Sequence, residues 1–323
     1  MEGLQEVSDK AESIFTRPLD ILVLMGGPSS EHDVSILSGT AIADALVSVG
    51  HTVRRADIGP SDTSALDGTP PDVVFIALHG EFGEDGQVQR LCEERGLPYI
   101  GSPPHASEIA MDKAASKVCY RQAGLSTPPW AVLEKLHSPQ DCRQMLESIG
   151  LPCVLKPLTG GSSVDVSIVG DATQRDKLVK SLLGKYPRVL AEKFVKGREL
   201  TVGVLGHRAL PVIEIRPRRA FYDYQAKYFD DDTEYLFEHD LDAKTVAYLQ
   251  DCSLKAHQAL GCRDISRSDF LLDEQGVAWV LETNTIPGFT SHSLVPKAAK
   301  RIGYSFVQLC EELVKMALER EGE

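Results

Sequence analysis

The sequence lacks the features that mark secreted, disulfide-linked or membrane-spanning proteins. Its seven cysteines are scattered over 323 residues and include no C-x-x-C pair. We therefore expect reduced, mostly buried thiols, as in a cytoplasmic protein, in place of disulfides or a zinc site. No apolar run approaches the ~18 residues that a transmembrane helix needs. The polar, acidic N-terminal segment has neither the basic start nor the apolar middle of a signal peptide.

Positive charge is also scarce. The chain has 34 Lys and Arg residues against 47 Asp and Glu, a formal net charge of −13. This balance argues against a general nucleic-acid or membrane-surface binder, which needs a basic patch. Anionic ligands remain compatible with it, since they need only local positive groups. The length is sufficient for two or three lobes with a sizeable core.

Strands alternate with helices in the first third of the chain. We expect strands at residues 19–25, 73–78 and 97–100. A helix-like segment follows the first, and a glycine-rich loop and a helix follow the second. This alternation predicts a mostly parallel α/β sheet, which we assign to an N-terminal domain of residues 1–102.

The pattern changes to mixed α+β after a predicted helix at residues 106–123. Short strands at 132–133, 153–156 and 164–169 and a helix at 172–183 predict a small central lobe, residues 103–191. Strands at 189–195, 199–205 and 212–216, a hairpin, and helices near 242–260 and 305–320 predict a larger, antiparallel-rich lobe, residues 192–323. The expected fold class is α/β and α+β.

The hairpin carries the clearest chemical signal. Apolar runs at 270–272 and 277–281 flank a polar turn, so Asp269 is expected close to Glu282, with Asn284 on the same side. Two carboxylates and an amide oxygen are hard ligands that suit Mg²⁺ held against phosphates. A surface hairpin with polar ends is the alternative. Arg267 and free backbone N–H groups in the turn after Asn284 are suited to stabilising an oxyanion.

Two lysines are candidates for binding phosphate. Lys156 ends a strand and precedes a Gly-Gly-Ser-Ser loop at 160–163, whose backbone N–H groups suit an anion. Lys113 lies just inside a predicted helix. Each feature alone is weak, because flexible turns and solvated helix lysines have the same appearance.

Further candidates surround these. Residues 189–199 resemble a hinge whose backbone suits an adenine edge, with Glu199 suited to ribose hydroxyls; an edge strand with surface charges is the alternative. The aromatic segment 221–228 predicts an active-site lid or a packed surface loop. Glu31 lies near a helix N-terminus, and His79 opens a loop after a strand; each is also compatible with a structural role.

In order and spacing, these motifs resemble the D-alanine–D-alanine ligases of the ATP-grasp superfamily, from about Leu22 to Leu318. The segments that carry the resemblance are LMGGPSSEHDVSILSG, ALHGEFGEDGQVQ, LPYIGS with AMDK, LKP with GSSV, AEKFVKGRELTV, FYDYQAKY, and SRSDF with LETNTIPGFTSHSLVPKAA.

The resemblance implies ATP and two Mg²⁺ ions, with Mn²⁺ as a substitute, held between the central and C-terminal lobes. The metal ligands would be Asp269, Glu282 and Asn284. The nucleotide would be bound by Lys113, Lys156, Ser163, Glu192, Lys193, Val195, Glu199 and Lys227. The two substrates would be held by Glu31, His79, Ser293 and Leu294, and the tetrahedral intermediate by Arg267 and the Gly288 N–H. Tyr228 would link to Ser162 and Glu31 and close the lid.

The implied reaction supplies D-alanyl–D-alanine for peptidoglycan through an acyl phosphate. A related ligase that uses D-lactate, D-serine or another second substrate, and a weakly catalytic nucleotide-binding paralogue, are the alternatives. The chain departs from the family pattern at Gly160, Asp165 and Ser268. The resemblance also suggests a cytoplasmic homodimer acting on small molecules, with no nucleic-acid or membrane partner.

Overall fold

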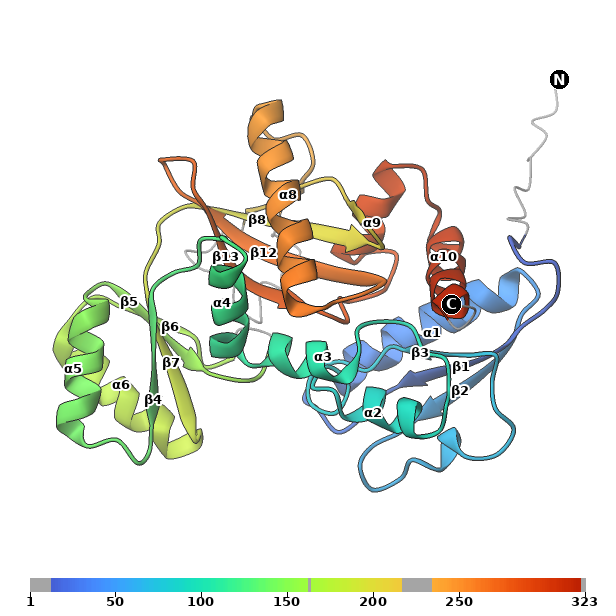
Figure 1. The fold of residues 1–323 in the computed structure, drawn as a ribbon, viewed down its shortest axis with the longest axis horizontal. Helices are drawn as coiled ribbons and strands as arrows, with labels where there is room; N and C mark the ends of the chain where they lie inside the picture. The colour runs from blue at the N-terminus through green and yellow to red at the C-terminus, as the bar shows by residue number, and fades with distance from the viewer. Residues whose placement is uncertain (1–12, 162–163, 217–233, 321–323) are drawn as a thin grey trace, which may run out of the picture.

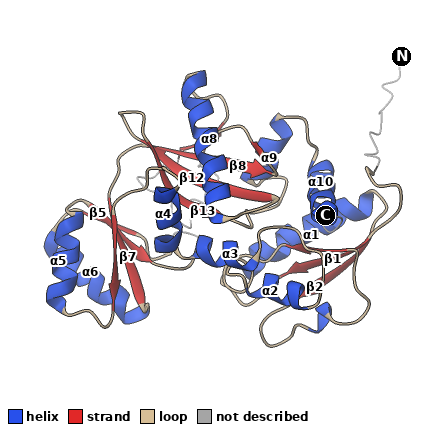
Figure 2. Cartoon of the chain, in the orientation of Figure 1, coloured by secondary structure: helices blue, strands red, loops and turns tan. Residues whose placement is uncertain are grey.

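The computed structural model describes residues 13–161, 164–216 and 234–320. Within them, the chain forms three sheets, each with its own helices (Figures 1 and 2). Ser162, Ser163, Lys227 and Tyr228 lie outside the described residues.

The N-terminal sheet is parallel, as predicted, with the order β2-β1-β3. The strand predicted at residues 97–100 is wrong: Tyr99 forms only an isolated parallel bridge with Val74. Strand β2 forms one edge of this sheet. The apolar pattern did not reveal it, because its residues are exposed or half-exposed. The elements are β1 (Asp20–Met25), α1 (His32–Ser48), β2 (Thr52–Asp57), η1 (Ser64–Leu66), β3 (Val73–Ile76) and α2 (Gln87–Glu94).

The single helix predicted at residues 106–123 is also wrong. It is two helices, α3 (Pro104–Met111) and α4 (Lys113–Gln122), that break at Asp112. Asp112 has extended backbone angles, and its carboxylate accepts hydrogen bonds from the Ala114 and Ala115 N–H groups at 3.0 Å. An N-cap of this kind satisfies donors that a helix start leaves open. The break places Lys113 in the first turn of α4.

The central sheet is antiparallel, in the order β4-β7-β5-β6, with α5 and α6 packed on it (Figure 1). Their apolar side chains form a separate small core. The elements are β4 (Trp130–Glu134), α5 (Pro139–Ile149), β5 (Cys153–Pro157), β6 (Ser167–Val169), α6 (Ala172–Lys185) and β7 (Arg188–Lys193).

The C-terminal sheet is larger, antiparallel and ordered β11-β10-β8-β12-β13, with β9 paired to β8. Helix α8 covers one face, and α4 packs against α8 and β13. The last helix, α10, returns to the N-terminal sheet and packs on α1 and β3. The elements are β8 (Arg198–Leu205), β9 (Arg208–Ala209), β10 (Ile213–Arg216), β11 (Glu234–Leu236), α8 (Ala243–Leu260), β12 (Ile265–Leu272), β13 (Ala278–Asn284), α9 (Leu294–Arg301) and α10 (Phe306–Glu319).

The β12–β13 hairpin has the predicted register. Asp269 is the partner of Glu282, and Arg267 is the partner of Asn284. A bulge follows between Asp269 and Phe270. Bulges of this kind re-aim side chains at functional edges of sheets.

The three-domain division at residues 102 and 191 stays a prediction. Two features of the structure concern where its boundaries lie. Strand β7 belongs to the central sheet as far as Lys193. Helix α4 precedes the central sheet in the chain but packs against the C-terminal one. Across the described ranges, no helix is both long and apolar enough to cross a bilayer.

Candidate functional site

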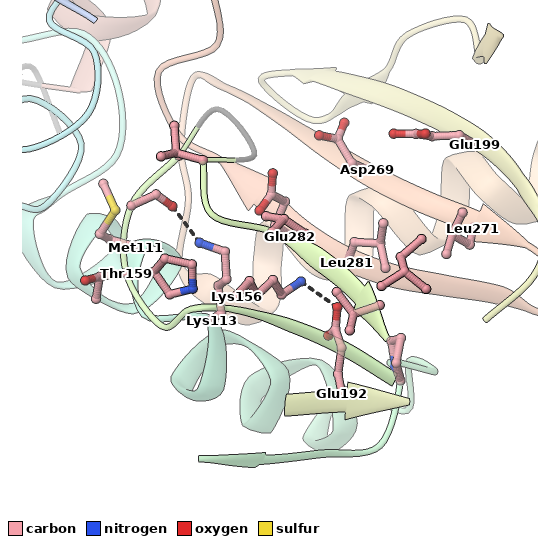
Figure 3. A pocket seen from close by; sticks show the side chains of 18 of the residues that line it. Met111, Lys113, Lys156, Thr159, Glu192, Glu199, Asp269, Leu271, Leu281 and Glu282 are labelled. Atoms are coloured by element: carbon pink, nitrogen blue, oxygen red, sulfur yellow. Dashed lines mark hydrogen bonds and ion pairs between the residues drawn. The ribbon is translucent and has the colours of Figure 1, made fainter. Parts of the chain in front are cut away.

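Two adjoining cavities lie where the three parts of the chain meet. The larger, about 1170 Å³, opens between the central and C-terminal sheets, and the smaller, about 530 Å³, lies against the N-terminal loops. Figure 3 shows Asp269, Glu282 and Glu199 facing Lys113, Lys156 and Glu192 across the larger cavity. The residues that line both cavities are Ser30, Glu31, Met111, Lys113, Gly160, Gly161, Ile215, Asp269 and Glu282.

Both predicted phosphate lysines line the larger cavity. The Lys113 Nζ donates a hydrogen bond to the Gly160 carbonyl at 2.6 Å, which ties α4 to the glycine-rich loop (Figure 3). The Lys156 Nζ lies 2.6 Å from Oε1 of Glu192. The structure therefore brings two cationic groups from different segments to one wall.

Glu192 is held between two lysines at the floor of this cavity. Its Oε1 faces Lys156, and its Oε2 lies 2.8 Å from the Nζ of Lys117. Burial alone would raise the pKa of the Glu192 carboxyl, but the two neighbouring lysines lower it to about 2. Burial lowers the pKa of Lys117 to about 8, an effect that Glu192 partly offsets. Glu192 is therefore an anion whose side chain orders two cations.

The alternative of an edge strand with surface charges is wrong for β7. It lies between β4 and β5, and Glu192 is buried. The Lys193 backbone N–H donates a hydrogen bond to the Pro129 carbonyl at 2.9 Å, so it is paired within the protein. Lys193, Val195 and Glu199 line the larger cavity at the end of this strand and the start of the next.

Asp269 and Arg267 form a bidentate ion pair, with Nε and Nη2 each 2.9 Å from one carboxylate oxygen. The Thr201 hydroxyl donates to Asp269 Oδ1 at 2.6 Å. The Asn284 side-chain oxygen accepts from the Ile286 N–H at 2.8 Å. These contacts orient the side-chain oxygen atoms of Asp269 and Asn284, two of the three predicted ligands.

The donor set of this site fits a magnesium ion that also contacts phosphates. Asp269 and Glu282 face both cavities. No third His, Cys, Asp or Glu joins them in a cluster among the residues that the structure describes. Two carboxylates and one amide leave open positions for phosphate and water oxygens, as Mg²⁺ in phosphoryl-transfer sites requires.

The predicted substrate residues line the smaller cavity. His79 is buried, with Nε2 3.0 Å from the Ser38 hydroxyl and Nδ1 3.1 Å from the Ile286 carbonyl. Glu31 is buried and lines both cavities. Ser293 accepts a hydrogen bond from the Thr290 N–H at 3.0 Å. Arg267, Asn284, Gly288, Ser293 and Leu294 also line this cavity.

The three departures from the family pattern have structural explanations. Asp165 lies 3.1 Å from the Lys185 Nζ and accepts a hydrogen bond from the Tyr186 hydroxyl at 2.7 Å; it does not line either cavity. Ser268 is fully buried opposite Thr283, with the two hydroxyls 2.8 Å apart. Gly160 adopts φ = 104°, which favours glycine, and an added Cβ would meet no atom within 4 Å.

Sequence reasoning missed Lys117 and Glu84. Lys117 has the appearance of an ordinary helix lysine four residues after Lys113, and only the fold shows that its side chain is completely buried. Glu84 lines the smaller cavity with its carboxylate 3.6 Å from His79 Nδ1, and burial raises its pKa. The glycine-rich setting of Glu84 was a signal; Lys117 gave none.

Comparison with known proteins agrees with this geometry. The model of the D-ala D-ala ligase C-terminus matches residues 119–315, and that of the N-terminus matches residues 56–102. The D-alanine–D-alanine ligase of Bordetella petrii is 44% identical over 299 residues, 91% of each chain.

Solved structures extend the comparison to the fold. D-alanine–D-alanine ligase from Bacillus anthracis, complexed with ATP, has a TM-score of 0.81 and 31% identity, covering 94% of this chain and all of that one. A D-Ala:D-Ser ligase from Enterococcus faecalis has a TM-score of 0.83 and 26% identity, covering 93% and 100%. The expected ATP-grasp architecture is confirmed, and the chain belongs to the D-alanine–D-alanine ligase family.

Proposed function

We propose that this chain joins two D-alanine molecules into D-alanyl–D-alanine for peptidoglycan synthesis and converts ATP to ADP and phosphate. The observation that carries the proposal is the wall shared by the two cavities. Lys113, Glu31, Asp269 and Glu282 belong to both. A γ-phosphate in the larger cavity and a carboxylate in the smaller one would meet at this wall.

In the first step, the carboxylate of the first D-alanine attacks the γ-phosphate of ATP, giving an acyl phosphate and releasing ADP. Two anions must approach each other, so the step needs positive charge at the shared wall. Lys113 and Lys156 supply it from the nucleotide side. We assign Glu192, Lys193 and Val195 to the adenine end and Glu199 to the ribose.

Asp269, Glu282 and Asn284 would hold the proposed Mg²⁺ ions, for which Mn²⁺ is a substitute. When bound, the ions would neutralise phosphate charge. The bidentate ion pair with Arg267 orients the Asp269 carboxylate in the free protein. The carboxylate is thus ordered before any ligand binds.

In the second step, the amine of the second D-alanine attacks the acyl carbonyl, and phosphate leaves. We assign Arg267 and the Gly288 N–H to the oxyanion that forms, since both line the smaller cavity. Glu31 would bind the ammonium group of the first D-alanine and His79 its carboxylate. Ser293 and Leu294 would hold the second.

An acyl phosphate hydrolyses when water enters, so the reaction needs a cover. We assign this role to Ser162, Ser163 and Tyr228, and nucleotide binding to Lys227. Tyr228 would connect to Ser162 and Glu31.

The homodimer and the cytoplasmic location also remain proposals. Light scattering of the purified protein tests whether it is a homodimer.

The weakly catalytic paralogue loses its main argument. That hypothesis relied on the departures at Asp165 and Gly160, and the Asp165 carboxylate pairs with Lys185 and Tyr186 and does not line either cavity. Incubation with ATP, Mg²⁺ and D-alanine tests the proposal. Dipeptide and ADP in equal amounts support it. Robust turnover of another acid–amine or acid–hydroxyl pair, without this dipeptide, assigns the chain to a sister activity.

A further inference from the structure

Lys117 is a buried cation that lies behind the nucleotide cavity. Its side chain is 0% exposed, and Nζ donates hydrogen bonds to the Thr127 hydroxyl at 2.8 Å and the Pro128 carbonyl at 3.3 Å. Glu192, with Oε2 at 2.8 Å, and the ring of Trp130, with its centroid 5.6 Å away, also lie close to Nζ. Lys117 does not line the cavity itself.

The three charges form a chain from the interior to the cavity surface. Lys117 contacts one oxygen of Glu192, and Lys156 contacts the other at 2.6 Å. Lys156 and Glu192 line the cavity, and their side chains are 9% and 4% exposed. Two cations and one anion leave a net charge of +1.

This arrangement determines what a polyphosphate would meet at Lys156. Without Lys117, the single carboxylate of Glu192 would neutralise Lys156, and the floor of the cavity would carry no net charge. With Lys117 in place, Glu192 is compensated from behind. Charges interact strongly at such positions, because little water screens them.

We propose that Lys117 is a positioning residue of the nucleotide site, which neutralises Glu192 and thereby leaves the charge of Lys156 for the phosphates of the nucleotide. The inference rests on the proposed use of ATP. A role confined to folding would be served by an apolar residue of the same length, since burying a charge costs free energy that a methionine would not require.

The test compares the affinities of two probes, Mg·ADP and adenosine, by titration calorimetry on the intact protein. Lys117→Met should weaken Mg·ADP by at least about tenfold, the effect of ~1.4 kcal/mol. Adenosine, which lacks phosphates, should change by less than about threefold. Lys255→Met is the matched control, because Lys255 is a half-exposed lysine on α8 that pairs with Asp251; both affinities should stay at the wild-type values.

A second variant separates the charge from the fold. Lys117→Met combined with Glu192→Gln removes one charge of each sign, so Lys156 keeps its net charge. The ratio of the two affinities should return to within about threefold of the wild-type ratio. The double variant also provides the test if Lys117→Met alone does not fold.

Three results would overturn the proposal. The first is equal weakening of Mg·ADP and adenosine in Lys117→Met, or no weakening of either. The second is a double variant that remains as defective toward Mg·ADP as the single one. The third is failure of both variants to fold while Lys255→Met folds. A wild-type protein that binds Mg·ADP but forms no dipeptide would refute only the proposed function.

Discussion

The Tyr186 hydroxyl donates a 2.7 Å hydrogen bond to Asp165, the residue that stands where the family pattern has glycine. Asp165 adopts φ = 55°, a left-handed conformation that costs a non-glycine residue about 1 kcal/mol. The contacts with Tyr186 and Lys185 lower the pKa of its carboxyl. Asp165 is therefore anchored by Lys185 and Tyr186 and does not line the larger cavity.

Substitution of Asp165 should affect stability and spare nucleotide binding. Asp165→Ala loses both contacts and keeps the unfavourable φ, whereas Asp165→Gly loses the contacts but relieves the backbone. The alanine variant should be less stable than the glycine variant by about 1 kcal/mol. The KM for ATP should stay within about twofold of wild type in both. Tighter ATP binding in either variant would mean that the carboxylate repels the phosphates.

Asp269→Asn should abolish most turnover while leaving the fold intact. One carboxylate of the proposed Mg²⁺ site is lost, which should lower kcat/KM by about a hundredfold or more. The unfolding free energy should fall by less than about 3 kcal/mol, since the amide can still accept from Arg267. Kinetics across a range of Mg²⁺ concentrations and chemical denaturation measure the two effects.

Asp273→Asn is the matched control in the same hairpin. Asp273 accepts hydrogen bonds from the Gln275 and Val277 N–H groups and the Trp279 indole, at the turn of the hairpin, and it lines neither cavity. This variant should lose stability and keep normal turnover of the folded fraction. If Asp269→Asn instead lost stability alone, the hairpin would be structural and its assignment to metal binding would fail.

Ser268 should stabilise the hairpin through Thr283. The two hydroxyls are 2.8 Å apart, and Tyr120 of α4 donates to Thr283 at 2.9 Å. Ser268→Ala should cost about 1–2 kcal/mol of unfolding free energy. In a double-mutant cycle with Thr283→Val, the coupling should reach about 1 kcal/mol. A coupling near zero would show that the buried hydroxyls act independently.

His257 should make the protein sensitive to mild acid. Burial, with a smaller effect of His207, lowers its pKa from 6.5 to about 4. Between these values the unfolded chain binds more protons, so stability is fully present above pH 6.5 and is lost as pH falls toward about 4. The loss due to this residue should be about 3 kcal/mol. Denaturation of wild type and His257→Gln at a series of pH values measures it; equal slopes would contradict the assignment.

The sequence predicted the hairpin because a short turn between two apolar runs determines which residues of the two strands pair with each other. Asp269 and Glu282 are indeed partners. Prediction from the sequence failed where tertiary contacts determine the local structure. The break at Asp112 depends on one side chain capping α4, and the amphipathic pattern continues across it.

The central position of β7 could not be read from its residues either. Glu192 in a short apolar run has the appearance of a surface charge, and only the pairing with β4 and β5 buries it. Lys117 is then required as its partner, although its local sequence is that of an exposed helix. Buried charge networks join residues distant in sequence, so single-segment patterns do not reveal them.

The most direct test of the account is product analysis of a reaction that contains the purified wild-type protein, ATP, Mg²⁺ and D-alanine. We expect D-alanyl–D-alanine, ADP and phosphate in equal amounts, with none of the three when Mg²⁺ is removed. ADP formation without the dipeptide, or a dipeptide formed only when a different second substrate is supplied, would contradict the proposed function.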